Sequence, residues 1–124
     1  MAVHILVIDD DVIIRRLFSM YLQKQGFLVS NVPSVEEGLE ILRHSKIDVV
    51  ICDVIMPGMN GFDFLKIVKS DSALKRIPVI VLSATGLQEE MLLLEFKASR
   101  VLSKPCMPQE LEKVILELMQ KGED

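Results

Sequence analysis

Five short runs rich in valine and isoleucine recur along the sequence and limit the possible folds more than any other feature. They are HILVID, FLVSNV, IDVVICD, PVIVLS and SRVLS. Runs of this length and composition predict β-strands. The longer segments that follow each run have the period of amphipathic helices, over residues 12–25, 35–44, 62–70, 88–97 and 109–121. Strands that alternate with helices predict an α/β fold with a parallel sheet.

The strand runs are apolar on both faces, so we expect helices to cover both sides of the sheet. This predicts a doubly wound α/β fold with five parallel strands and five helices. The chain has 124 residues, half of them apolar, which is enough for a substantial core. The connections are short and there is no low-complexity tract or linker, so we expect residues 1–124 to form a single domain.

Charge and composition exclude several kinds of protein. No apolar run approaches the roughly 20 residues of a membrane span, and MAVHILVIDD lacks the basic start of a secretory signal, so we expect no membrane contact and a cytoplasmic location. Cys52 and Cys106 have no metal-ligand spacing and are expected to be free thiols. A net charge of -4 without a basic cluster predicts no direct nucleic-acid binding.

Polar residues stand where four of the five strands end. Asp9 and Asp10 follow the first strand, Asp53 ends the third, Ser83 ends the fourth and Lys104 follows the fifth. Ligands of open parallel sheets gather beyond the carboxyl ends of the strands. These residues are therefore the candidates for a functional site.

If the first and third strands are neighbours, the carboxylates of Asp9, Asp10 and Asp53 lie close together. Two such charges about 4 Å apart repel by roughly 4 kcal/mol at an effective dielectric near 20, so a cation must offset them. Carboxylates without histidine or cysteine favour a hard ion, and Mg²⁺ commonly adds water and phosphate oxygens to one or two carboxylates. The acidic cluster therefore predicts a Mg²⁺ site that works with a phosphate.

Lys104 and Ser83 supply donors to the same site. A lysine is a compact charge on a flexible stem, suited to meet a phosphoryl oxygen or, in its absence, the carboxylate of Asp53. Ser83 offers one hydroxyl. Asp11 has a separate interpretation, as the N-cap of the first helix.

Four motifs in this order, LVIDDD, VVICDVIMPGMNG, VIVLSAT and SKP, resemble the response-regulator receiver domain of two-component signalling, the CheY-like family, over essentially the whole chain. The resemblance implies the flavodoxin-like strand order 2-1-3-4-5 and a cis peptide bond between Lys104 and Pro105. It also implies roles for the site residues: Asp53 as phosphoacceptor, Asp9, Asp10, Asp53 and the Ile55 carbonyl as Mg²⁺ ligands, Ser83 as the switch hydroxyl and Lys104 as the phosphate contact.

The implied function is a phosphoacceptor switch. Asp53 would take a phosphoryl group from a sensor histidine kinase or a histidine phosphotransfer protein, and the domain would change conformation to regulate a partner. Such a domain is not a turnover enzyme, although it catalyses its own phosphorylation and dephosphorylation. The alternative is a pseudo-receiver, a non-phosphorylated interaction module. A dehalogenase-type phosphatase needs a second acid two residues after its nucleophile, where this chain has Ile55.

Two features predict where a signal leaves the domain. Residues 91–94, MLLL, sweep roughly 300° of a helix surface, so at least one of these side chains should face solvent. Val101 stands where the family usually has an aromatic residue and is too small to act as a rotating aromatic switch. We therefore expect an unknown output partner, or a phosphorylation-dependent homodimer, to pack on the fourth helix and fifth strand.

Overall fold

The computed structural model describes residues 2–84 and 89–122. Strands and helices alternate along the described chain. The elements are β1 (His4–Ile8), α1 (Val12–Lys24), β2 (Leu28–Val32), α2 (Val35–His44), β3 (Val49–Asp53), α3 (Gly61–Lys69), β4 (Val79–Ser83), α4 (Glu89–Leu94), β5 (Arg100–Ser103) and α5 (Pro108–Gly122).

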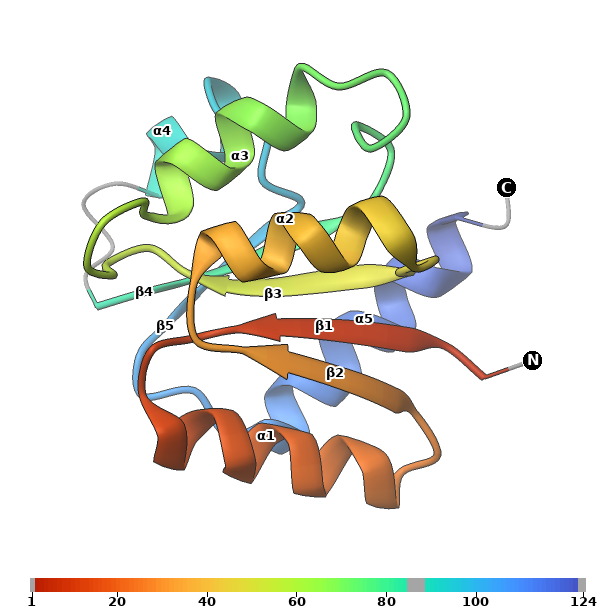
Figure 1. Ribbon diagram of the computed structural model, residues 1–124. Helices are drawn as coiled ribbons and strands as arrows, with labels where there is room; N and C mark the ends of the chain where they lie inside the picture. The colour runs from red at the N-terminus through yellow and green to blue at the C-terminus, as the bar shows by residue number, and fades with distance from the viewer. Residues whose placement is uncertain (1, 85–88, 123–124) are drawn as a thin grey trace.

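The five strands form one parallel sheet in the order β2-β1-β3-β4-β5, which confirms the doubly wound fold and the strand order expected from the resemblance. Helices α2, α3 and α4 cover one face, and α1 and α5 cover the other (Figure 1). Each face has its own apolar core, the first containing Phe64 of α3 and the second containing Phe18 of α1. None of the described helices is both long enough and apolar enough to span a bilayer.

Local signals set most of the helix boundaries. Asp11 caps α1, and its carboxylate accepts hydrogen bonds from the amides of Ile13 and Ile14 at 2.9 and 3.2 Å. Ser34 caps α2 by accepting a hydrogen bond from the Glu37 amide at its hydroxyl. After α1 the chain turns at Gly26, whose φ of 97° favours glycine.

The prediction of a fourth helix ending at residue 97 was wrong. Helix α4 ends at Leu94, and the chain then turns through Lys97, which has a φ of 63°. The ring of Phe96 packs edge-on against Phe62 of α3, with centroids 4.9 Å apart, instead of continuing the helix. The predicted start at residue 88 lies outside the described residues.

Candidate functional site

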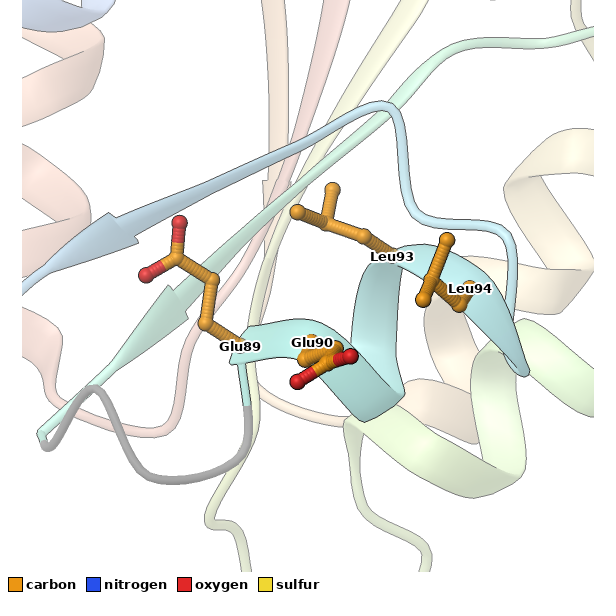
Figure 2. A pocket seen from close by; sticks show the side chains of 4 residues that line it. All are labelled: Glu89, Glu90, Leu93 and Leu94. Carbon is orange, nitrogen blue, oxygen red and sulfur yellow. The ribbon is translucent and has the colours of Figure 1, made fainter.

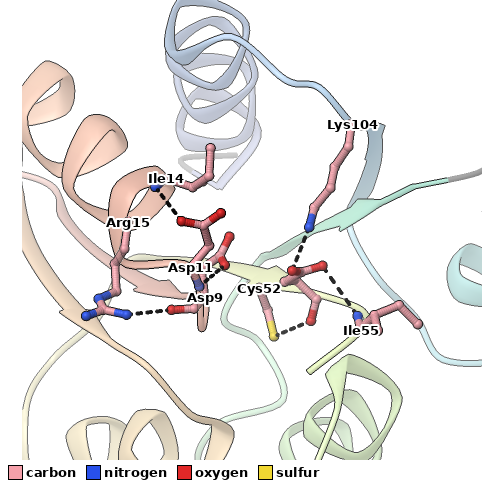
Figure 3. Close-up of polar contacts among 8 residues, drawn as sticks. Asp9, Asp11, Ile14, Arg15, Cys52, Ile55 and Lys104 are labelled. Atoms are coloured by element: carbon pink, nitrogen blue, oxygen red, sulfur yellow. Dashed lines mark hydrogen bonds and ion pairs between the residues drawn. The ribbon is translucent and has the colours of Figure 1, made fainter. Parts of the chain in front are cut away.

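The sheet register brings the polar strand ends together. Ile8 of β1 pairs with Cys52 of β3, so Asp9 and Asp53 follow paired residues on neighbouring strands. Ser83 of β4 pairs with Ser103 of β5, and Lys104 comes next. The predicted site residues therefore gather at one edge of the sheet. Figure 3 shows Asp9 and Lys104 at this edge.

The three carboxylates at this edge form one compact cluster. Ligand oxygens of Asp9, Asp10 and Asp53 all lie within 4.8 Å of one another. Asp9 is 2% exposed and Asp53 is 4% exposed, whereas Asp10 is exposed to solvent. Burial raises the pKa of the Asp9 carboxyl, and the charges of Asp53 and Asp10 raise it further, against the opposing effects of the Asp11 amide and Lys104.

Asp9 has one oxygen with a partner and one without. Its Oδ1 accepts a hydrogen bond from the Asp11 amide at 2.9 Å. Its Oδ2 is buried and has no hydrogen-bond partner in residues 2–84 and 89–122. Buried polar atoms without partners are costly and uncommon in native proteins, so this oxygen is suited to a ligand.

Asp53 is already paired with a cation. Its Oδ2 lies 2.6 Å from Nζ of Lys104, and its Oδ1 accepts a hydrogen bond from the Ile55 amide at 3.3 Å. Both side-chain oxygens of Asp53 therefore have a hydrogen-bond donor. Lys104 is bound to Pro105 by a cis peptide bond, as predicted.

Ser83 lies at the end of the adjacent strand. Its side chain is 3% exposed, and its carbonyl accepts a hydrogen bond from the Lys104 amide at 2.8 Å. This bond ties the end of β4 to the lysine that contacts Asp53. Ser83 is thus a buried residue that is hydrogen-bonded through its backbone to Lys104 of the ion pair.

The donor set of the acidic cluster fits a hard divalent cation. All the side-chain ligand atoms are carboxylate oxygens, and one of them, Asp9 Oδ2, is buried without a partner. Mg²⁺ prefers such oxygen ligands. The carbonyl of Ile55 as a further ligand remains a prediction, since the contact shown for Ile55 is made by its amide.

Arg15 is a part of this edge that sequence reasoning missed. Its Nη1 donates to the Asp9 carbonyl at 2.8 Å (Figure 3), and its Nε donates to Asn31 Oδ1 at 3.0 Å. Asn31 lies in β2, the one strand whose end was not considered polar. The signal was weak because a lone arginine in a surface helix usually faces water.

Cys52 lies next to Asp53, and its thiol is not a strong nucleophile. Its thiol is buried and donates to the Asp53 carbonyl, with Sγ 3.4 Å from the oxygen. Burial raises the pKa of this thiol far above its usual value, and the charges of Asp53 and Asp9 add to the effect. The thiol therefore stays protonated at neutral pH.

Helix α4 exposes part of its apolar surface, as predicted. Leu94 is 62% exposed and Met91 is 42% exposed, whereas Leu92 is fully buried. A hollow of about 390 Å³ lies along this helix and is lined by Glu89, Glu90, Leu93 and Leu94. Figure 2 shows these four side chains. This surface is apolar with an acidic rim.

Comparisons with known proteins agree with this geometry. The family described as the response regulator receiver domain matches residues 5–116. The "Probable transcriptional regulator ycf29" of Cyanophora paradoxa is 36% identical over 114 residues, which cover 91% of this chain and 54% of that protein. The "DNA-binding response regulator MtrA" of Mycolicibacterium smegmatis is 30% identical over 125 residues, covering 100% of this chain and 54% of that protein.

Solved structures give the same result. The chemotaxis response regulator CheY4 of Vibrio cholerae superposes with a TM-score of 0.87 at 31% identity, covering 94% of this chain and 98% of that chain. A response regulator receiver domain protein from Clostridium thermocellum has a TM-score of 0.87 at 31% identity, with 98% and 97% covered. The present chain spans about half the length of the two curated relatives named above.

The fold and the acidic strand edge define the class as a CheY-like doubly wound domain. Within that class, the chain belongs to the response regulator receiver domain family of two-component systems. Receiver domains generally bind Mg²⁺ through an acidic cluster, and Asp9, Asp10 and Asp53 form such a cluster here. The alternative of a non-phosphorylated interaction module gains no support, because the acidic residues and Lys104 are all present and assembled.

Proposed function

We propose that this receiver domain is a phosphoacceptor switch with Asp53 as the nucleophile. The observation that carries the proposal is the ion pair between Asp53 and Lys104, 2.6 Å long, beside the carboxylates of Asp9 and Asp10. A buried carboxylate that is flanked by the ammonium group of a lysine is suited to attack phosphorus. The surrounding strand ends hold it in position.

The phosphoryl donor is a phosphohistidine of a sensor histidine kinase or a histidine phosphotransfer protein. An Asp53 oxygen forms a bond to phosphorus while the phosphorus–nitrogen bond breaks, and the imidazole of the donor leaves with the electron pair and takes up a proton. The product is an acyl phosphate on Asp53. Since the transition state is loose, the domain contributes mainly position and charge neutralisation.

The residues divide this work between them. Mg²⁺, when bound, supplies charge neutralisation and holds a phosphoryl oxygen; it would be held by Asp9, Asp10, Asp53 and the Ile55 carbonyl. Lys104 exchanges its contact with Asp53 for one with the phosphoryl group. Ser83 donates its hydroxyl to the same group, and its backbone bond to Lys104 couples both movements.

The result is a change in the populations of two conformations, which a partner reads. The output partner binds α4 and β5, or two phosphorylated copies associate through this face, with Val101 contributing packing. The domain catalyses its own phosphorylation and dephosphorylation without processing a diffusible substrate. Its two free thiols suit a reducing compartment, and we place the reaction in the cytoplasm.

Phosphorylation by a small donor tests the proposal. Incubation with acetyl phosphate and Mg²⁺ should add one phosphoryl group to the wild type, as measured by intact mass. The group should be absent from Asp53→Asn and from samples with excess chelator. Asp71→Asn is the matched control, since Asp71 is exposed and its side chain accepts from the Ala73 amide. Labelling of Asp53→Asn, or equal labelling with chelator, would show that the assignment is wrong.

A further inference from the structure

Arg15 joins three elements at the acidic edge of the sheet. It lies in the first turn of α1, and its guanidinium contacts the carbonyl of Asp9 after β1 and the amide oxygen of Asn31 in β2. The Asp9 amide donates to the carbonyl of Val32, the final residue of β2, at 3.2 Å. The carbonyl of Asp9 lies beyond the strand, so Arg15 is its hydrogen-bond donor.

The hydrogen bond from Arg15 to the Asp9 carbonyl fixes the orientation of the backbone that carries Asp9 and Asp10. The carbonyl of Asp9 and the amide of Asp10 belong to one planar peptide group, so a bond to the carbonyl holds the plane that joins the two residues. The Asp9 carboxylate is held independently by the Asp11 amide at 2.9 Å. Asp9 is thus bonded at its backbone and at its side chain, and Oδ2 remains the buried oxygen without a partner.

Arg15 places a permanent charge near the acids without occupying their oxygens. A guanidinium stays protonated under all ordinary conditions, and its planar fork suits two acceptors at once. The guanidinium donates to a carbonyl and to an amide oxygen, whereas Lys104 is bonded directly to a carboxylate of the cluster. Arg15 therefore does not compete with a cation for carboxylate oxygens.

We propose that Arg15 is a positioning residue that holds Asp9 and Asp10 in the arrangement that binds Mg²⁺. This inference rests on the proposed function of the site. It assigns to β2, through Asn31, a part in shaping the metal site, although β2 contributes no ligand. Removal of a group that is hydrogen-bonded to a metal ligand commonly lowers metal affinity by about 10–100-fold.

Magnesium titration of the unphosphorylated protein tests the inference. We expect Arg15→Gln to weaken Mg²⁺ binding about tenfold or more, measured by calorimetry or amide chemical shifts. Arg15→Lys keeps the charge but not the planar fork that reaches two acceptors. Its Mg²⁺ affinity should lie between those of the wild type and Arg15→Gln. Arg16→Gln is the matched control, because Arg16 is the adjacent, exposed arginine of the same helix, and its Mg²⁺ affinity should equal that of the wild type.

A second readout separates positioning from general loss of structure. The Mg²⁺ concentration for half-maximal phosphorylation by acetyl phosphate should rise in Arg15→Gln, while the rate at saturating Mg²⁺ stays within a few-fold of the wild type. Equal Mg²⁺ affinity of Arg15→Gln and Arg16→Gln overturns the inference. If Arg15→Gln does not fold, a wild-type affinity of Arg15→Lys overturns it equally.

Failure of the proposed function gives a different result. A wild type that binds Mg²⁺ but is never phosphorylated contradicts the assignment of Asp53, and leaves the effect of Arg15 on metal affinity measurable. A wild type that does not bind Mg²⁺ contradicts the positioning role itself.

Discussion

Asp9 lies in a buried region where hydrogen bonds hold it on several sides. Leu94 lies in a short helix whose surface is partly exposed to solvent. All five residues of β3 are buried, and α1 has 13 residues with a side-chain cap. Helix α4 has six residues, and none of the four residues of β5 is fully buried. The first region holds the acidic site, and the second is the expected output surface. The contrast indicates that binding and phosphoryl chemistry need fixed atoms, while recognition by a partner needs accessible ones.

The largest expected effect comes from crowding the fixed region. In Gly61→Ala, the new Cβ would lie 2.8 Å from the Asp53 carbonyl oxygen and 2.9 Å from the Val54 Cα, both of them backbone atoms. We expect a loss of about 1–3 kcal/mol in the free energy of unfolding, measured in urea, and slower phosphorylation of Asp53.

Gly26→Ala is the control for this prediction. Gly26 has an unfavourable φ for alanine but open space around it, and it lies away from the site. It should cost about 1–2 kcal/mol and leave the phosphorylation rate unchanged. Wild-type stability and wild-type labelling of Gly61→Ala would show that the region is less tightly fixed than we infer.

Removal of the Asp9 charge should change stability less than Gly61→Ala does, and should raise stability instead of lowering it. The pKa of Asp9 is raised above its usual value of 3.8, mainly by burial. Between that value and the raised pKa the folded protein binds more protons than the unfolded chain, so this residue lowers stability as pH rises through the window. At pH 7 without Mg²⁺, Asp9→Asn should therefore melt at a higher temperature than the wild type.

The difference in melting temperature should shrink as the pH falls towards 3.8, where Asp9 becomes protonated in both states. Added Mg²⁺ should raise the melting temperature of the wild type more than that of Asp9→Asn. Asp71→Asn, at an exposed position, should show neither pattern. A lower melting temperature of Asp9→Asn at pH 7 would count against the predicted cost of burying this charge.

Changes at the contact between the two regions should alter the free energy of unfolding less. Phe62 of α3 and Phe96 after α4 form the edge-on ring contact that holds the α4–β5 connection. Phe96→Leu should lose about 0.5–1.5 kcal/mol of stability beyond the change in buried area. The double variant with Phe62→Leu should lose less than the sum of the single changes; strict additivity would show that the rings do not stabilise each other.

The smallest effect on stability is expected in the open region. Leu94→Glu should change the free energy of unfolding by less than about 0.5 kcal/mol, because the side chain is 62% exposed. With the phosphoryl mimic beryllofluoride, however, it should weaken self-association measured by sedimentation velocity, or binding of the output partner. Leu28→Glu, 54% exposed on β2, is the control. Unchanged association in Leu94→Glu would place the output surface elsewhere.

The sequence was most informative where the signal was local. The strand runs, the capping residues Asp11 and Ser34 and the acids at strand ends all follow from short patterns with a direct physical cause. The proximity of Asp9 and Asp53 required the strand order, which came from the resemblance, because periodicity does not determine which strands are neighbours.

Two features could not be predicted because they depend on contacts distant in sequence or on backbone conformation. Arg15 meets Asn31 only because α1 packs back beside β2. The early end of α4 depends on the packing of Phe96 and on Lys97 in a conformation that non-glycine residues seldom adopt. No sequence pattern marks a lysine for that conformation.

The buried thiol beside Asp53 has a consequence for how the domain tolerates oxidants and alkylating reagents. Sulfur reacts with such reagents as the thiolate, and burial keeps Cys52 in the neutral form. Cys106 is only half-buried, although its surroundings also raise its pKa, to about 12. Reagents should therefore reach Cys106 first and leave the strand of the phosphoacceptor unmodified. The domain can therefore keep a sulfur atom next to Asp53, the proposed phosphoacceptor, without that sulfur becoming a sensor of peroxide.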